Sequence, residues 1–308
     1  MKLVSFVIPV YNNAETITLI HQKIRSEVTS NFPELNYEII FVNDGSKDNS
    51  LQQIKKCRQE DPHVKIISFS RNFSQMSAIL AGWQYSKGDA VINMSADLQD
   101  PVEQCSKMIK EWLDGYNVVL SVRETREDSF INTLTSKIAY RLYKLSIPNM
   151  PIGGFDFTLL DRKALAAVNS LTNGFRCLQA DVLWIGFKVK NLPYTRLKRE
   201  FGKSQYTFLL RLNFFIKIYL SISYLPIRIM SAVGFFTALA GATYALSITY
   251  AYFMHNTPFN GWAPIMIIIL IIGGMLMIML GIIGEYIWRI YDAVQHKPEY
   301  IIAEQEGI

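Results

Sequence analysis

A cluster of oxygen-bearing side chains follows a short apolar run in the segment MSADLQDP, residues 94–101. In an extended chain that leaves a strand, residues two apart point the same way, so Asp97 and Gln99 are expected to face one side together. Mg²⁺ and Mn²⁺ prefer such oxygen ligands and need only one or two from protein when a diphosphate and water supply the rest. The segment therefore predicts a divalent-metal site suited to a nucleotide sugar; the alternative for Asp97 is a solvated turn.

Asp100 matches a different local pattern from its neighbours. It precedes Pro101 and lies three residues before Glu103, which is the spacing of an N-cap, a first-turn proline and a capping-box partner. We therefore predict that Asp100 caps a helix that begins at Pro101.

Short β-rich runs alternate with helical segments on both sides of residues 94–101 in the sequence. Such alternation predicts an α/β domain with a mostly parallel sheet covered on both faces, and ligands of these sheets collect beyond the carboxyl ends of the strands. Polar residues follow all the predicted strands, so one polar crevice is expected there. The strands are expected at 3–10, 37–43, 64–69, 90–94 and 117–122, and the helices at 14–30, 48–60, 74–87 and 101–114.

Other common sites are excluded by pattern. The chain has neither a GxGxxG motif nor a P-loop, and its four His residues are too scattered for a HExxH-type zinc site. Cys57, Cys105 and Cys177 lack the spacing of metal ligands or disulfides, as expected of reduced thiols in a cytoplasmic domain.

Two stretches near the C-terminus, 229–254 and 262–284, contain no charged side chain. Each exceeds the roughly 20 residues that cross a hydrocarbon core of about 30 Å, which predicts a transmembrane helical hairpin; buried helices of a soluble protein are the alternative. Lys and Arg precede the first stretch and follow the second, but the loop HNTPFNG between them has none. Both ends of the hairpin are therefore expected to face the cytoplasm.

The segment 207–227 is mostly apolar but carries Arg211 and Lys217, which predicts interfacial amphipathic helices on the membrane surface; a core helix is the alternative. The expected domains are a cytoplasmic catalytic domain at 1–206, the interfacial segment at 207–227, two transmembrane helices within 228–288 and a cytoplasmic tail at 289–308.

The motifs VIPVYNN, VNDGSKDNS, SRNFSQ and ADLQDP occur in the order and spacing of family 2 glycosyltransferases, which the chain resembles. VRETRED, GGFDFTLLDR, LWIGFK and REFGKSQYTF, followed by two apolar spans, are similar to polyprenyl-phosphate glycosyltransferases such as bactoprenol-phosphate glucosyltransferases and dolichol-phosphate mannose synthase. The resemblance covers nearly the whole chain through the second span. It implies a GT-A nucleotide-sugar-binding domain, and the combination of motifs is specific although each alone is weak.

The resemblance implies a nucleotide site around Pro9, Tyr11 and Asp44. Asp44 is expected to recognise uracil, because a carboxylate accepts from a base N–H; an Asx turn before Gly45 is the alternative. The other residues that the resemblance places near the nucleotide are Arg71 and Asn72 of the RNF element, and Asp97.

The metal motif departs from the family pattern at one position. Relatives commonly have DADLQDP, whereas the first Asp is Ser95 here, which removes one formal charge from the crevice. We expect Asp97 to hold the ion with help from Gln99, the diphosphate and water, and Ser95 to contribute a hydroxyl or to weaken the coordination.

Asp156 matches the residue that relatives place as catalytic base beside the acceptor; the alternative is a hydrogen-bonding loop residue after a turn at Gly153-Gly154. A lipid phosphate has its second pKa near 6 and is mostly unprotonated at neutral pH, so orienting the acceptor would suffice. Basic residues near a membrane also attract anionic lipid in general. The residues expected at the acceptor phosphate are Arg123, Arg126, Arg199, Lys203 and Ser204.

The implied activity is inverting transfer of a sugar, glucose by family weight, from a UDP-sugar to undecaprenyl phosphate with Mg²⁺ or Mn²⁺. The product would be a lipid-linked donor for cell-surface glycan modification at the bacterial inner membrane. One alternative is a non-catalytic nucleotide-binding subunit of a glycan assembly complex, which Ser95 favours. Another is a polysaccharide synthase, although the chain lacks its QxxRW signature.

The expected partners are the UDP-sugar, polyprenyl phosphate and membrane lipid, with no nucleic acid. A homo-oligomer is also expected, because Gly234, Ala238 and Ala242 form a stripe of small residues that suits close helix packing. A flippase and a downstream glycosyltransferase complete the expected partners.

Overall fold

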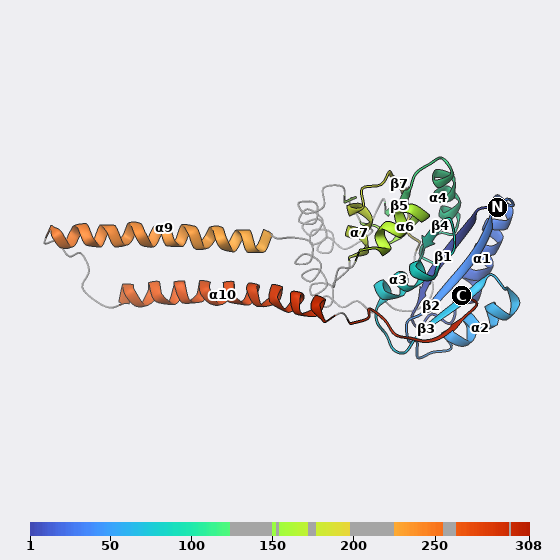
Figure 1. The fold of residues 1–308 in the computed structure, drawn as a ribbon, viewed down its shortest axis with the longest axis horizontal. Coiled ribbons are helices and arrows are strands. Elements are labelled where there is room, and N and C mark those ends of the chain that lie inside the picture. The colour runs from blue at the N-terminus through green and yellow to red at the C-terminus, as the bar shows by residue number, and fades with distance from the viewer. Residues whose placement is uncertain (124–149, 152–153, 172–176, 198–224, 255–262, 296) are drawn as a thin grey trace. The chain divides into compact units, whose positions relative to one another are not determined.

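The computed structural model describes residues 1–123, 150–151, 154–171, 177–197, 225–254, 263–295 and 297–308 (Figure 1). The chain divides into two compact units. One combines Met1–Phe215 with Lys297–Ile308, and the other is Ile216–His296. The N-terminal part and the last residues of the chain therefore fold together.

The first unit is built on a sheet that has eight strands within the described residues, in the order β7-β5-β6-β4-β1-β2-β3-β8. β1, β2, β3 and β4 pair in parallel, as do β5 and β7, whereas β6 and β8 run antiparallel to their neighbours. The mostly parallel sheet predicted from the sequence is confirmed. The strands are β1 (Leu3–Val10), β2 (Asn36–Asn43), β3 (Val64–Phe69), β4 (Ala90–Asn93), β5 (Val118–Arg123), β6 (Phe157–Asp161), β7 (Val189–Tyr194) and β8 (Ile302–Glu306).

Helices cover both faces of this sheet (Figure 1). One hydrophobic core forms where α1, α2 and α4 pack on the sheet, and the second forms under α3, α6 and α7. The central strands are buried on both faces, which is why β1 to β4 are mostly apolar rather than alternating, and the buried Glu38 of β2 pairs with Lys65 of β3. These helices are α1 (Ile17–Asn31), α2 (Ser50–Glu60), α3 (Gln75–Tyr85), α4 (Glu103–Leu113), α6 (Arg162–Asn169) and α7 (Leu178–Trp184).

The second unit contains two long apolar helices, α9 (Leu225–Phe253) and α10 (Ala263–Val294). Both are long and apolar enough to cross a membrane. α9 begins inside the predicted interfacial segment; the rest of that segment, 207–224, lies outside the described residues.

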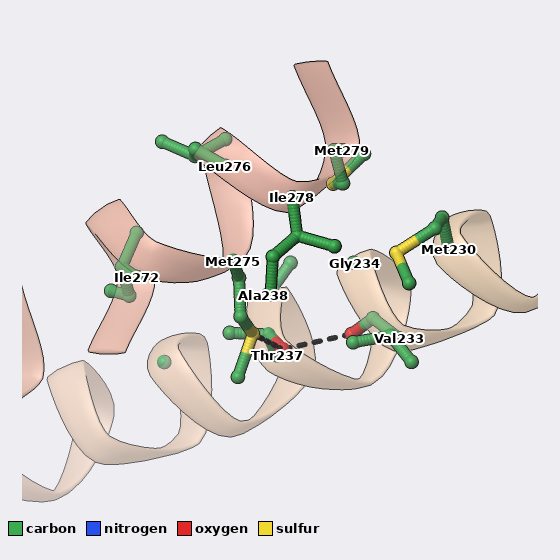
Figure 2. Close-up of a pocket in the computed structure, with 11 residues that line it drawn as sticks. Met230, Val233, Gly234, Thr237, Ala238, Ile272, Met275, Leu276, Ile278 and Met279 are labelled. Atoms are coloured by element: carbon green, nitrogen blue, oxygen red, sulfur yellow. Dashed lines mark hydrogen bonds between the residues drawn. The ribbon is translucent and has the colours of Figure 1, made fainter. Parts of the chain in front are cut away.

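A cavity of about 390 Å³ lies between α9 and α10 (Figure 2). Gly234 and Ala238 of the predicted small-residue stripe line it, with Gly241 rather than Ala242 as the next small residue. The hydroxyl of Thr237 donates to the carbonyl oxygen of Val233 at 2.8 Å, so this polar group is satisfied within its own helix. The rest of the lining is methionine and aliphatic side chains, as expected of a surface that lipid covers.

The tail predicted after the hairpin contains a strand that the sequence pattern did not reveal. β8 pairs antiparallel with β3, with Ile66 opposite Glu306 and Phe69 opposite Ile302. Tyr300, Ile302 and Ile308 pack against the core under α3. The last residues of the chain therefore close the β3 edge of the sheet.

Candidate active site

The loops after β1 and β2 are joined to each other at the carboxyl ends of the strands. Asn12 has a left-handed backbone with φ 53°, and its side-chain oxygen accepts from the amide of Lys47 at 2.9 Å. In return, the amide of Asn12 donates to the hydroxyl of Ser46 at 3.0 Å. Of the predicted nucleotide residues in this region, Pro9 is buried inside β1 and Tyr11 is half-buried at the start of the loop.

Asp44 holds the loop that follows β3. Its two carboxylate oxygens accept from the backbone amides of Phe73 at 2.6 Å and Ser74 at 3.0 Å, and the residue is 2% exposed. Burial raises the pKa of Asp44 above its usual value, although these two amides and the nearby Arg71 oppose the shift. The alternative Asx turn is not observed at Asp44, because it is Asn43 that accepts from the amide of Ser46. Asp44 thus organises the loop 70–74, and uracil recognition stays a prediction.

Gly45 brings the β2 and β3 loops into direct contact. It has φ +66°, and a Cβ atom there would lie 2.4 Å from the carbonyl carbon of Arg71 and 2.6 Å from the amide nitrogen of Asn72. A larger residue would force these backbones apart. Arg71 and Asn72 are exposed, and the guanidinium of Arg71 lies 4.0 Å from the ring centroid of Phe73.

The segment after β4 forms a turn rather than an extended chain. Leu98 has a left-handed backbone with φ 57°, which places Asp97 and Gln99 differently from the alternation expected of a strand. Asp97 is 6% exposed, and its Oδ1 accepts from the hydroxyl of Ser95 at 2.6 Å and the amide of Gln99 at 3.2 Å. The side-chain nitrogen of Gln99 donates to the carbonyl oxygen of Leu197 at 3.1 Å. The expectation that Asp97 and Gln99 point the same way by strand alternation is therefore wrong.

Asp100 does not cap α4, so the predicted capping box is also wrong. The helix begins at Glu103, its N-cap position is Val102, and no side chain caps it. Instead, the carboxylate of Asp100 accepts from the amide of Ser95 at 3.2 Å and from the hydroxyl of Tyr194 at 2.9 Å. Burial raises the pKa of Asp100 above its usual value even though Arg196 and Tyr194 oppose the shift.

Arg196 and Tyr194 belong to the site but were not predicted from the sequence. A nitrogen of the Arg196 guanidinium lies 3.6 Å from Asp97, and its Nε lies 4.0 Å from Asp100. The amide of Leu197 also donates to the carbonyl oxygen of Gln99 at 2.9 Å. This bond holds the chain after β7 against the turn at residues 95–100, which we call the acidic turn. Tyr194 and Arg196 are far in sequence from Asp97 and Asp100. The only sequence signal for their contact with these carboxylates was the basic character of the region 196–203.

Asp156 lies just before β6 and is paired with Arg123 at the end of β5. A guanidinium nitrogen of Arg123 donates to the Asp156 carboxylate at 2.8 Å, and Gln179 of α7 donates to the other carboxylate oxygen at 2.9 Å. Burial lowers the pKa of Arg123, but Asp156 and Tyr194 outweigh burial and raise the pKa above its usual value. The carboxylate of Asp156 is half exposed, so it remains accessible to a substrate.

Tyr194 links the two carboxylate groups of the site. β5 and β7 pair with Arg123 opposite Tyr194, and the Tyr194 hydroxyl accepts from Arg123 Nε at 3.4 Å while donating to Asp100. Burial raises the pKa of Tyr194, so the hydroxyl stays protonated at neutral pH. A continuous path of contacts therefore runs from Asp156 through the Arg123 and Tyr194 side chains to the acidic turn.

The oxygen groups at this turn suit a hard divalent cation. The carboxylate of Asp97 and the hydroxyl of Ser95 are ligand types that Mg²⁺ and Mn²⁺ accept. In the described part of the chain, no group of three or more His, Cys, Asp or Glu is placed to hold a metal ion.

Four of the predicted acceptor residues, Arg126, Arg199, Lys203 and Ser204, lie outside the described residues. The fifth predicted acceptor residue, Arg123, lies within the described residues, and its guanidinium contacts Asp156 and Tyr194.

Replacing Arg196 by Gln removes a positive charge within 4.0 Å of both Asp97 and Asp100. We expect the affinity for Mn²⁺ without nucleotide to rise about three- to tenfold, because a partly exposed charge contact is worth roughly 1 kcal/mol. Titration of free Mn²⁺ by electron paramagnetic resonance measures it. Lys190→Gln is the control, since Lys190 lies on β7, shortly before Arg196, but pairs with Glu111 at 3.4 Å. Unchanged or weaker Mn²⁺ binding by Arg196→Gln would contradict the expectation.

Comparison with known families assigns both parts of the chain. Residues 5–168 match the model of glycosyl transferase family 2, and residues 225–290 match that of the GtrB C-terminal hairpin. The chain is 36% identical to the uncharacterized glycosyltransferase YkcC of Bacillus subtilis, over 99% of this chain and 94% of that protein. It is 32% identical to the bactoprenol glucosyl transferase of Shigella phage SfV, over 98% of this chain and 99% of that protein.

Among solved structures, the mannosyltransferase PcManGT from Pyrobaculum calidifontis, in complex with GDP-Man and Mn²⁺, is similar with a TM-score of 0.50. The match covers 95% of this chain and 86% of that one at 15% identity, so it supports the fold alone. The order of the strands, the polar loops at their carboxyl ends and the full-length relatives all indicate the same family. The chain therefore belongs to glycosyltransferase family 2, with a GT-A-like catalytic domain and the C-terminal hairpin of the GtrB type.

Proposed function

We propose that this protein transfers glucose from UDP-glucose to a polyprenyl phosphate, with inversion at the anomeric carbon. The observation that carries the proposal is the path of contacts joining the acidic turn at Asp97 to the accessible carboxylate of Asp156. It joins a place for the donor diphosphate to a place for an acceptor. The acceptor class and glucose are supported by the bactoprenol glucosyl transferases of Shigella phages SfV and SfII, which match over 99% and 97% of their length.

The donor binds at the carboxyl ends of β1, β2 and β3. Asp44 fixes the loop 70–74, which keeps the exposed side chain of Arg71 beside the nucleotide site. Asp97 would hold a divalent cation, supported by Ser95 and the loop of Gln99, and a bound ion there would neutralise charge on the leaving diphosphate. Mg²⁺ and Mn²⁺ both suit such oxygen ligands, and Mn²⁺ is used in the tests because it can be followed spectroscopically.

The acceptor oxygen attacks from the side of Asp156. Because a lipid phosphate is mostly dianionic at neutral pH, it is already a nucleophile and needs orientation more than deprotonation. Arg123 and Gln179 hold the two oxygens of the Asp156 carboxylate and so fix its direction. Arg123 also brings positive charge to the region where two anionic substrates meet.

The apolar helices α9 and α10 keep the enzyme beside an acceptor that stays in the bilayer, which raises its effective concentration. Both ends of the hairpin connect to the same unit of the protein, because Lys297–Ile308 folds with Met1–Phe215. Two membrane crossings return the chain to the side from which it started. We infer that the catalytic unit and both termini lie on the cytoplasmic side of the bacterial inner membrane, as the basic residues flanking the hairpin also indicate. A homo-oligomer, a flippase and a downstream glycosyltransferase stay predictions.

The test is product formation by the purified full-length protein in lipid nanodiscs. Undecaprenyl phosphate and Mn²⁺ are supplied with UDP-glucose, UDP-galactose, UDP-N-acetylglucosamine or GDP-mannose, and the lipid product is identified by mass spectrometry. We expect glucosyl phosphoundecaprenol from UDP-glucose alone. Nucleotide binding without lipid product for every donor would instead establish the non-catalytic subunit that Ser95 originally favoured.

A further inference from the structure

The segment after the hairpin, Lys297–Ile308, lies outside both family matches, which end at residues 168 and 290. Within it, β8 pairs with β3, and the register shifts between Ser68 and Phe69, at the point where β3 ends and the loop 70–74 begins. The remaining contacts of the segment fall into two groups. One group secures the strand itself, and the other reaches the loop.

The contacts that secure the strand lie away from the nucleotide site. Lys55 of α2 pairs with Glu304, and the side chains of Ile302 and Ile308 pack on the core under α3. These contacts protect an otherwise open strand edge, which is a common need of sheets. They do not explain why an aromatic residue, Tyr300, precedes the strand beside the loop.

The contacts that reach the loop come from Tyr300 and Ile301. The Tyr300 ring stacks on Phe69 with a centroid distance of 4.9 Å and an interplanar angle of 15°. Phe69 in turn meets Phe73 edge to face at 5.8 Å. The carbonyl oxygen of Ile301 accepts from the amide of Ser70 at 3.0 Å. The tail therefore contacts Ser70 at the start of the loop directly, and it contacts Phe73 indirectly, through the ring of Phe69.

The far side of the same loop is held by Asp44, which accepts from the amides of Phe73 and Ser74. The loop 70–74 is thus held by two sets of contacts, which we call its two clamps. One is Asp44, directly after β2, and the other is Tyr300 and Ile301 near the C-terminus. A loop held in its binding conformation before the ligand arrives loses less conformational entropy on binding, which strengthens affinity.

We propose that the C-terminal segment is a positioning element of the nucleotide site, with Tyr300 as its main positioning residue. Tyr300 and Ile301 fix the loop so that the amides of Phe73 and Ser74 meet Asp44 and the Arg71 side chain stays beside the donor. The inference rests on the proposed function, because it takes a nucleoside diphosphate as the ligand of this loop. It predicts that the tail controls donor affinity and leaves the rate of transfer alone.

The experiment compares three variants of the full-length protein in nanodiscs. Tyr300→Leu removes the stacked ring, Tyr300→Phe keeps the ring but loses the hydrogen bond to Gln84, and Glu304→Gln removes the ion pair of the same strand. We expect Tyr300→Leu to raise the Kd for UDP, measured by calorimetry with Mn²⁺, and the KM for the sugar donor by about tenfold, with kcat within about twofold. Tyr300→Phe and Glu304→Gln are expected to stay within about twofold of wild type in all three quantities.

Hydrogen exchange provides a readout that does not depend on nucleotide. Tyr300→Leu is expected to speed exchange of the amides of Ser70, Phe73 and Ser74 and to leave β1 and β2 unchanged. Tyr300 is half-buried at the sheet edge, so the fold should survive; Tyr300→Met, which fills more of the space, decides if Tyr300→Leu does not fold.

The outcomes separate the two proposals. Wild-type protein that does not bind UDP overturns the proposed function, and the tail is then judged by exchange of the loop amides alone. Wild-type UDP affinity in Tyr300→Leu, or a loss of kcat at unchanged KM, overturns the positioning role while leaving the glycosyltransferase intact.

Discussion

Replacing Asp97 by Asn is expected to lower kcat for lipid-linked sugar formation by about a thousandfold, which is the scale of losing an electrostatic group that stabilises a transition state. Asn keeps the shape of the side chain and an oxygen that still accepts from Ser95 and from the amide of Gln99. The turn should therefore stay folded. What is lost is the negative charge that would hold the cation against the leaving diphosphate.

Initial rates across a Mn²⁺ titration measure this effect, and UDP binding without metal serves as the internal check. We expect that binding to stay within about twofold of wild type, because the nucleoside is held by other loops. Ser95→Ala is the matched control, since it removes a hydroxyl from the same turn without changing charge, and a loss of about tenfold or less is expected. Activity of Asp97→Asn close to that of wild type would remove Asp97 from the metal role.

The second large effect is expected at Asp156. Asp156→Asn should lower kcat by about 10²- to 10⁴-fold, the usual contribution of a positioned acid–base or orienting group, with UDP affinity within about twofold of wild type. The amide keeps an oxygen for Gln179 but can no longer pair as an anion with Arg123. The freed guanidinium would then hold the acceptor phosphate in an unproductive position.

The pH dependence separates two roles of Asp156. If it removes a residual phosphate proton, the defect of Asp156→Asn should shrink above about pH 7, where a phosphate with its second pKa near 6 has lost that proton. If it orients the acceptor, the ratio of wild-type to variant rates should stay constant from about pH 5.5 to 8.5. We expect the constant ratio.

Asp161→Asn, at the other end of β6, is the control for Asp156. Asp161 caps α6 by accepting from the amide of Ala164 at 2.7 Å, and its other carboxylate oxygen accepts from the side-chain amide of Asn117. Asn can keep the cap but not the second bond, so this variant should reduce stability rather than turnover. A comparable loss of kcat in both variants would mean that Asp156 acts through the fold.

The central part of the fold could be predicted from the sequence because its strands are buried on both faces. β1 to β4 are mostly apolar, and the predicted ranges differ from the observed ones by a residue at most. The outer strands give weaker signals. β7 contains Lys190 and Pro193, which argue against a central strand, but β7 lies at the edge of the sheet, where a proline without an N–H is tolerated. β8 is the polar sequence IAEQE, whose pairing depends on β3 rather than on its own pattern.

The site was predictable where function follows strand ends and was missed where it depends on contacts distant in sequence. Asp44 and Asp97 follow strands, as expected, whereas Asp156 was identified from the family resemblance and precedes β6, a strand that the sequence pattern did not predict. Local rules failed at Asp100, where three capping signals agreed but a tyrosine of β7 takes the carboxylate. Tertiary contacts override local propensity when both compete for one side chain.

The strand at the C-terminus also imposes an order on biosynthesis. β3 leaves the ribosome early, whereas β8 emerges only after α9 and α10 have been translated, roughly tens of seconds later at ordinary elongation rates. Until then the β3 edge is unpaired, and the loop 70–74 lacks the contacts of Tyr300 and Ile301. A nascent or prematurely terminated chain should therefore bind little sugar nucleotide. Full donor affinity arises only when both hydrophobic segments are ready for membrane insertion.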